Sequence, residues 1–181
     1  MNAALTFLDK HLGFLIRIDR KQKIQAALVL GVTVIAMAVF GSWFGVFIDA
    51  SELRCLPERV YLGYPKTRES RLGDIVSFMA DDRMAMGLFR GHRLGKIVMA
   101  KAGDRVVSDA RGVFINGTFI AARNPISLGK LKDRHLTPVD MDRVLEPGEL
   151  FVMGTLPRSF DSRYWGVIKE GVIDKFMKAV V

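Results

Sequence analysis

The feature that most constrains the fold is an uncharged apolar run at residues 24–48, IQAALVLGVTVIAMAVFGSWFGVFI. As a helix rising about 1.5 Å per residue, this run exceeds the roughly 30 Å hydrocarbon core of a bilayer. A cleaved secretory signal has a shorter apolar region that ends in small residues, whereas this run continues through Trp43, Phe44 and Phe47. We therefore expect an uncleaved signal anchor that spans the membrane, rather than a buried helix of a soluble protein.

Charged residues flank the apolar run asymmetrically. Asp49 and Glu52 follow it, and basic residues precede it, namely Lys10, Arg17, Arg20, Lys21 and Lys23. Under the positive-inside rule, this distribution places the N-terminus in the cytoplasm. The sequence thus predicts a basic cytoplasmic segment at 1–23, a transmembrane anchor at 24–48 and an extracytoplasmic domain at 49–181.

The whole chain is basic, with 27 Lys and Arg against 19 Asp and Glu and a formal net charge of +8. Such an excess is typical of proteins that bind nucleic acid or an anionic membrane surface. The sequence contains no basic stripe interleaved with aromatic residues and no nucleic-acid-binding signature. We therefore expect no nucleic-acid partner.

After the anchor, the pattern becomes strand-like. Short runs rich in Val, Ile and Phe alternate with Gly, Asp, Pro and Asn; they are RVYLGY, GDIVSFM, KIVMA, RVVSD, GVFINGTFIAA, ELFVMG and GVIDKFM. Asn116 and Gly117 suit the positive φ angles of a type I′ hairpin turn, and residues 123–149 form a long irregular excursion. We predict a mainly β fold, in which one N-terminal transmembrane helix precedes an antiparallel β-sheet domain of about 130 residues.

Few residues offer catalytic or metal-binding chemistry. His11, His92 and His135 are scattered, and Cys55 is the single cysteine, so we expect no metal site. A catalytic pair of Cys55 with His92 or His135 stays open, although no local signature supports it. The other route is a nucleophile activated by a lysine.

Lys96 is the lysine with the most apolar neighbours. A lysine acts as a general base only in its neutral form, which a desolvated setting favours. In KIVMAKAGD, strand alternation places Lys96, Val98 and Ala100 on one face, and Ile97 and the residues alternating with it on the other. On spacing alone, a solvated strand lysine is the simpler interpretation.

The order of the motifs favours the catalytic interpretation. The segments CLPERVYL, GDIVSF, KIVMAKAGDRV, VFING, LEPGELFVMG and SFDSRYWG follow one another between residues 55 and 166. This series resembles the ordered boxes of type I signal peptidases, and the last box is the most specific. CLPERVYL and PRSFDSRYWG are most similar to the conjugative-transfer branch, which processes pilin precursors. The resemblance implies a signal-peptidase-type catalytic domain in the periplasm, anchored in a bacterial inner membrane, that needs no cofactor.

The resemblance also implies roles for individual residues. The family's serine nucleophile falls on Cys55, its general-base lysine on Lys96, and the serine that positions the lysine on Ser159. Asp161 and Arg163 match the pair that braces the site from behind, although an ordinary surface ion pair is the alternative. A thiol is more acidic and more nucleophilic than a hydroxyl, so Cys55 is chemically suited to the first role.

Three positions depart from the family pattern. Leu53 stands where many members have a hydroxyl residue near the oxyanion, so oxyanion stabilisation would rest on backbone N–H groups such as that of Cys55. Ile97 and Ala102 replace the usual Arg and Pro of the lysine box. Ser51 is an alternative nucleophile, although no proline follows it at the right distance.

The resemblance implies an exported precursor as the substrate, with a conjugative propilin as the expected example. Membrane lipid and the components of a conjugative type IV secretion apparatus are the other expected partners. Two alternatives remain: a general type I signal peptidase, and a non-catalytic pseudo-peptidase subunit of a conjugation or secretion apparatus.

Overall fold

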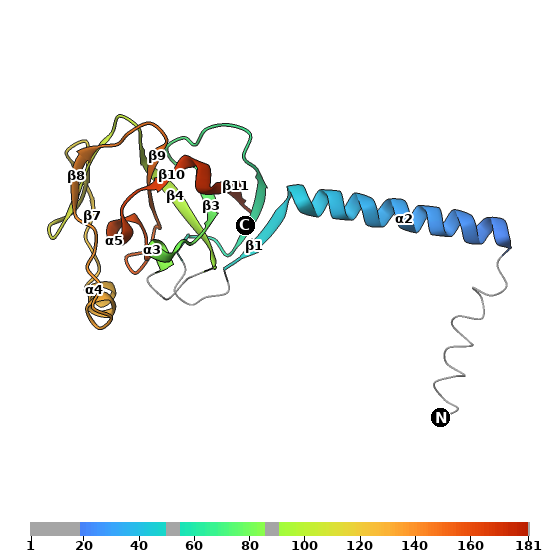
Figure 1. Cartoon of the computed structure of the whole chain (residues 1–181), viewed down its shortest axis with the longest axis horizontal. Helices are drawn as coiled ribbons and strands as arrows, with labels where there is room; N and C mark the ends of the chain where they lie inside the picture. Colours follow the sequence, from blue (N-terminus) through green and yellow to red (C-terminus); the bar gives the residue numbers. More distant parts are fainter. Residues whose placement is uncertain (1–18, 50–54, 86–90, 181) are drawn as a thin grey trace, which may run out of the picture. The chain divides into compact units, whose positions relative to one another are not determined.

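The structure is a computed structural model, which describes residues 19–49, 55–85 and 91–180 (Figure 1). Ser51 and Leu53 therefore lie outside the described residues. The chain divides into two units, with the boundary between Trp43 and Phe44. The first unit contains one long helix and the second contains the β sheets.

The long helix of the first unit is α2 (Arg20–Trp43), and its 24 residues have a mean hydropathy of 2.2. At about 1.5 Å per residue it is about 36 Å long, enough to cross a bilayer. None of its residues is buried, and it is the one such helix within the described parts of the chain. The helix begins after Asp19, whose carboxylate accepts a hydrogen bond from the Arg20 backbone N–H at 2.7 Å.

The predicted end of the apolar helix at Ile48 is wrong. The helix stops at Trp43, and the last residues of the apolar run form strand β1 (Gly45–Ile48), which pairs antiparallel with β2 (Val60–Pro65). Phe47 packs against a small core cluster of the β unit. Tertiary pairing therefore overrides the apolar pattern, which cannot distinguish the end of a membrane helix from a short apolar strand.

The second unit is built from antiparallel sheets, which confirms the predicted mainly β fold. The larger sheet has the order β1-β2-β11-β3-β4-β9-β10, in which the further strands are β11 (Ile173–Ala179), β3 (Ile75–Met79), β4 (Arg93–Lys101), β9 (Glu149–Met153) and β10 (Ile168–Lys169). The smaller sheet has the order β7-β6-β5-β8, with β7 (Thr118–Ala121), β6 (Gly112–Ile115), β5 (Arg105–Asp109) and β8 (Met141–Val144). The short helices are α3 (Asp82–Ala85), α4 (Pro125–Lys132), α5 (Ser162–Trp165) and the 3₁₀ turn η1 (Glu170–Val172).

The hairpin predicted at Asn116 and Gly117 is confirmed. Both residues have positive φ angles, 50° and 82°, and they connect β6 to β7 directly. The excursion at 123–149 is more ordered than its sequence suggested, because it contains α4 and β8. The Asn124 side chain caps α4 by accepting hydrogen bonds from two backbone N–H groups. The Leu131 side chain of this helix is buried.

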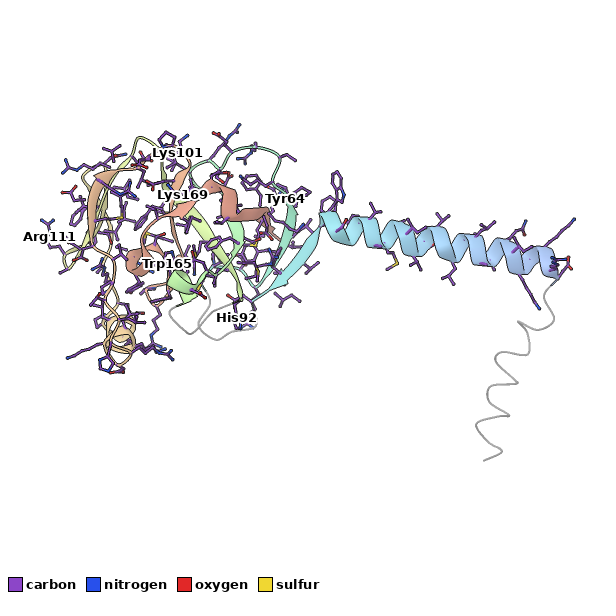
Figure 2. All side chains as sticks on the ribbon, viewed as in Figure 1. Tyr64, His92, Lys101, Arg111, Trp165 and Lys169 are labelled. Atoms are coloured by element: carbon purple, nitrogen blue, oxygen red, sulfur yellow. The ribbon has the colours of Figure 1, made fainter. Side chains whose placement is uncertain are left out.

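Strand β9 lies between the two main clusters of buried apolar side chains. Leu150 and Val152 belong to one cluster, and Phe151 and Met153 to the other. All five residues of β9 are buried, and the four from Leu150 to Met153 form a continuous apolar run because both faces of the strand are covered. Figure 2 shows Trp165 inside this unit, where it belongs to the first cluster.

Candidate active site

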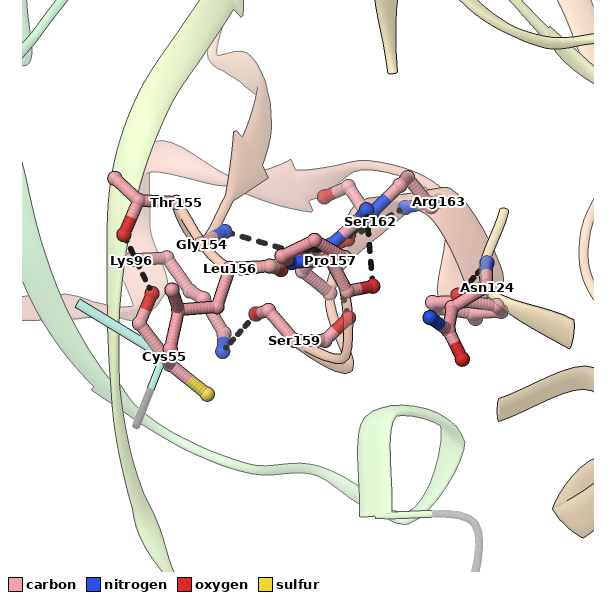
Figure 3. Close-up of polar contacts among 12 residues, drawn as sticks. Cys55, Lys96, Asn124, Gly154, Thr155, Leu156, Pro157, Ser159, Ser162 and Arg163 are labelled. Atoms are coloured by element: carbon pink, nitrogen blue, oxygen red, sulfur yellow. Dashed lines mark hydrogen bonds and ion pairs between the residues drawn. The ribbon is translucent and has the colours of Figure 1, made fainter. Parts of the chain in front are cut away.

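Lys96 is buried, with 1% of its surface exposed. Its side chain lies on the same face of β4 as Val98, as the alternation predicted, while Ile97 is only partly buried. The predicted position of Ala100 on this face is wrong, because a bulge between Val98 and Ala100 turns Ala100 towards the second apolar cluster. The Lys96 Nζ donates a hydrogen bond to Ser159 Oγ at 3.0 Å (Figure 3). The interpretation of Lys96 as a solvated strand lysine is therefore wrong.

Ser159 lies in the turn that joins β9 to α5, and 2% of its surface is exposed. Its backbone N–H donates to the carbonyl oxygen of Leu156 at 3.0 Å. Gly154 begins this turn and allows it to approach the rest of the site closely. A Cβ atom at Gly154 would lie 2.2 Å from Ser159 Oγ and 2.5 Å from the carbonyl oxygen of Cys55. Gly154 ends the motif LEPGELFVMG, but only the folded turn reveals this crowding.

Asp161 and Arg163 form a buried ion pair behind Ser159, so the alternative of a surface pair is wrong. Their exposed fractions are 0% and 2%, and two guanidinium nitrogens each donate to the Asp161 carboxylate at 2.7 Å. The Asp161 carboxylate also accepts from the Gly154 N–H at 2.9 Å, and Arg163 donates to the Ser159 carbonyl at 3.0 Å. The pair thus fixes both ends of the turn that carries Ser159.

Burial lowers the pKa of the Arg163 guanidinium, but the hydrogen bonds to Asp161 outweigh this effect and the pKa is raised. Arg163 therefore stays charged. Since two opposite charges satisfy each other inside the domain, the ion pair holds the turn without leaving an unpaired buried charge.

Arg123 is a second buried arginine that sequence reasoning missed. It donates to the carbonyl oxygens of Arg163 and Val139, both at 2.8 Å, and pairs with the Asp140 carboxylate at 2.6 Å. It also donates to Ser108 on β5. Arg123 therefore connects the smaller sheet to the turn behind the site. No motif marks it, because its partners are mostly backbone carbonyls from distant segments.

Cys55 is half-buried, and its backbone is bonded to the same turn. Its carbonyl oxygen accepts a hydrogen bond from the Thr155 N–H at 2.9 Å. Its own N–H donates to Asp49 Oδ2 at 3.4 Å, so the N–H expected at the oxyanion already has a weak acceptor. Figure 3 shows the Cys55 thiol and the Lys96 amine extending into the same region of the site.

Cys55 and Lys96 line one pocket of about 660 Å³. The amine of Lys96 is hydrogen-bonded to Ser159. Within the described structure, no hydrogen bond joins this amine to the Cys55 thiol. His92 lines the same pocket, whereas His135 is not part of its wall. No cluster of three metal-binding side chains occurs within residues 19–49, 55–85 and 91–180.

The pocket has an apolar side and an open strand edge. Its apolar lining includes Leu56, Tyr61 and Met177, which form the small core cluster beside β1. Along the pocket, β4 pairs with β3 from Arg93 to Ile97, but its pairing with β9 begins only at Ile97. Among the described strands, the other edge of residues 93–96 is therefore unpaired and available to an extended peptide.

The family profile described as "Signal peptidase, peptidase S26" matches residues 21–179. The chain belongs to this family. The signal peptidases of this family are serine proteases that cleave leader peptides from precursor proteins. The predicted family membership is thus confirmed, and a signal peptidase with one N-terminal apolar helix is expected to associate with a membrane.

The similar solved structures include a signal peptidase I from Enterococcus faecalis, which is 21% identical to this chain. The match covers 62% of this signal peptidase and 100% of the bacterial structure, with a TM-score of 0.39. The comparison with curated proteins gave no match.

Proposed function

We propose that this signal peptidase cleaves exported precursors with Cys55 as nucleophile and Lys96 as general base, and that its substrate is a conjugative propilin. The observation that carries the proposal is the position of Lys96. A buried amine, oriented by a hydrogen bond to Ser159, lies at the wall of a pocket that Cys55 also lines. This combination matches what a lysine-dependent nucleophile requires.

The reaction proceeds in two stages. Lys96, in its neutral form, takes the thiol proton of Cys55, and the sulfur attacks the scissile carbonyl carbon. The C–N bond then breaks, Lys96 returns the proton to the departing amine, and the leader peptide remains attached as a thioester. Water, deprotonated by Lys96, hydrolyses the thioester and regenerates the thiol. Ser159 orients the amine throughout, because the Asp161–Arg163 pair holds its turn.

The substrate binds in an extended conformation along the unpaired edge of β4, at residues 93–96. Backbone hydrogen bonds to a strand edge bind a peptide without regard to its side chains. Specificity then comes from the pocket, where Leu56 and Met177 limit the size of an apolar side chain. Gly95 leaves space for both of them, because a Cβ there would lie 2.6 Å from Met177 Cε and 3.1 Å from Leu56 Cδ1.

Helix α2 anchors the enzyme in the bacterial inner membrane, with the N-terminal residues in the cytoplasm and the β unit in the periplasm. The length and hydropathy of α2 support a membrane span. Arg20, Lys21 and Lys23 at its start support the orientation. Membrane lipid and components of a conjugative type IV secretion apparatus are the proposed partners.

The test is processing of a candidate propilin by the full-length protein in detergent. We expect Lys96→Ala to abolish cleavage, whereas Lys101→Ala, which removes an exposed lysine of the same strand, leaves it unchanged. Native protein and Cys55→Ser should both cleave, and a thiol alkylator should stop only the native protein. Equal cleavage by native protein and Cys55→Ala would refute Cys55 as nucleophile and move the search to Ser51.

A pseudo-peptidase is the second candidate function. The observation that favours it is the absence of a hydrogen bond between the described Cys55 thiol and Lys96. Inactive native protein together with an active Cys55→Ser variant would support this alternative. A general signal peptidase would instead cleave many unrelated exported precursors as readily as the propilin.

A further inference from the structure

Two cationic side chains at the wall of the active-site pocket have no partner among the described residues. Lys130 on α4 and Arg158 beside Ser159 both line the pocket that contains Cys55 and Lys96, and both are exposed. No residue in the described parts of the chain forms an ion pair or a side-chain hydrogen bond with either of them. Their charges are therefore available to a molecule that enters the pocket.

The other charged groups of the pocket wall are engaged within the protein. Arg93 pairs with Asp174 and lies over the Phe47 ring, and Lys96 donates to Ser159. Asp49 is the one acidic residue of the described pocket wall, and its carboxylate accepts from the Cys55 N–H. The free charge facing the pocket is thus positive.

The backbones that carry Lys130 and Arg158 are both held in place. Ser127, Lys130 and Leu131 are spaced as one helical face and all line the pocket, while Leu131 is 1% exposed. The Asn124 backbone N–H at the start of α4 donates to the Tyr164 hydroxyl at 2.8 Å. Arg158 directly precedes Ser159, whose carbonyl is bound by Arg163. Both cations are therefore carried by backbone segments that the fold holds in place.

We propose that Lys130 and Arg158 recognise an acidic side chain of the precursor, close to the scissile bond. This inference rests on the proposed function and adds a specificity element to it. An anionic residue of the substrate would form ion pairs with both cations, which have no partner in the described parts of the chain, and the attraction would also raise the association rate. An amide in place of that carboxylate would lose both pairs.

Anionic lipid is the competing occupant, because the end of α4 and the turn after it carry further basic residues. Lys132 and Arg134 are exposed near Lys130, but neither is part of the pocket wall. A lipid-binding surface would use all of these cations, whereas substrate recognition would use only the two that line the pocket. Lys132 and Arg134 therefore provide a control pair of equal charge.

The experiment measures kcat/KM of the full-length protein in neutral detergent on peptides with small residues before the scissile bond. Each peptide carries Glu or Gln at one position, moved in turn through the four positions on either side of that bond. At low salt we expect the native protein to prefer Glu at one position about five- to tenfold, as two exposed ion pairs allow. The preference should fall as salt is added.

The double variant Lys130→Gln/Arg158→Gln should lose the Glu preference, with a ratio near one. The double variant Lys132→Gln/Arg134→Gln should keep both the preference and the rate. A charge-reversed Lys130→Glu/Arg158→Glu variant should prefer Lys at the same peptide position, which would exclude loss of folding as the cause.

Three outcomes would overturn the inference: a native protein that treats Glu and Gln alike at every position, a control pair that loses the preference equally, or a preference that appears only in vesicles with phosphatidylglycerol. Binding of the same peptides to Lys96→Ala, measured by fluorescence anisotropy, separates the two proposals. Suppose that the native protein cleaves no peptide, while the Lys96→Ala variant binds Glu peptides through Lys130 and Arg158. The proposed function then fails and the inference stands. If the native protein cleaves the peptides without a preference for Glu, the proposed function stands and the inference fails.

Discussion

Replacing Gly154 with alanine tests the geometry of the site most directly. The added Cβ would lie 2.2 Å from Ser159 Oγ and 2.5 Å from the Cys55 carbonyl oxygen, whereas an ordinary contact begins near 3.4 Å. Ser159 and Cys55 therefore have to move by about 1 Å in Gly154→Ala. The hydrogen bond from Lys96 to Ser159, now 3.0 Å long, would be broken or badly lengthened.

A displacement of about 1 Å in a positioning group lowers a catalytic rate by about 10²-fold. We expect Gly154→Ala to lower kcat for precursor cleavage by that factor and to destabilise the fold by about 1–3 kcal/mol, as overpacking does. Cleavage kinetics and thermal unfolding in detergent measure the two effects. Gly171→Ala is the matched control, because a Cβ there meets nothing within 4 Å.

The effect on the rate should act through Ser159. In a Ser159→Ala background, most of the loss caused by Gly154→Ala should disappear, because residues that act through one contact are not additive. A native kcat in Gly154→Ala would refute the reasoning. So would a loss of the same size with and without Ser159, since it would show that the methyl group acts elsewhere.

Two further predictions concern buried carboxylates. Glu149 is 4% exposed, and its hydrogen bonds to Arg143, and then to the Glu146 N–H and Lys169, lower its pKa to about 2. Because the pKa is lower in the folded protein than in the unfolded chain, this group stabilises the fold above pH 4.5, and the contribution is lost as the pH falls towards 2. Glu149→Gln should therefore lower the unfolding free energy at pH 7 by about 3 kcal/mol, and this difference from the native protein should vanish near pH 2. Denaturant titrations from pH 7 to pH 2 measure the difference. Glu146→Gln, at an exposed position, is the control. Asp161→Asn should lower stability by about 3–5 kcal/mol, because it leaves the Arg163 charge buried without a counter-charge. The same titration should show a loss of less than about 1 kcal/mol in unfolding free energy for Asp142→Asn, which breaks the exposed pair with Arg105. Equal losses in Asp161→Asn and Asp142→Asn would contradict the role given to the buried pair.

Local patterns predicted the parts of the fold whose side chains obey a simple period. The alternation from Lys96 to Val98 and the Asn116–Gly117 turn are examples, since each depends on neighbouring residues alone. The bulge after Val98, which turns Ala100 to the other face, has no such local signal. Strand β1 was not predicted, because its four residues continue the apolar run of the membrane helix without a charged or turn residue between them. Their pairing with β2 depends on residues further along the chain, since Gly45 pairs with Gly63 and Ile48 with Val60.

The candidate site divides in the same way. The motif series brought forward Lys96, Ser159 and the Asp161–Arg163 pair, and the structure places them together, with Lys96 bonded to Ser159 and the ion pair behind it. Arg123 lies in no motif of the series, and Gly154 ends the motif LEPGELFVMG without any role that the motif predicts. Their importance comes from backbone atoms of distant segments, which a single sequence does not display.

Strand β9 has a consequence for how the site responds to changes elsewhere. Since it is shared by both apolar clusters, neither cluster can open without exposing the strand that leads into the Ser159 turn. Backbone amides of β9 should therefore exchange with solvent only through global unfolding. The Ser159 turn starts at Gly154, directly after β9, so its first residue is held as firmly as the strand. Substitutions deep in either cluster, far from the pocket, would thus reach the chemistry by shifting the point from which the turn begins.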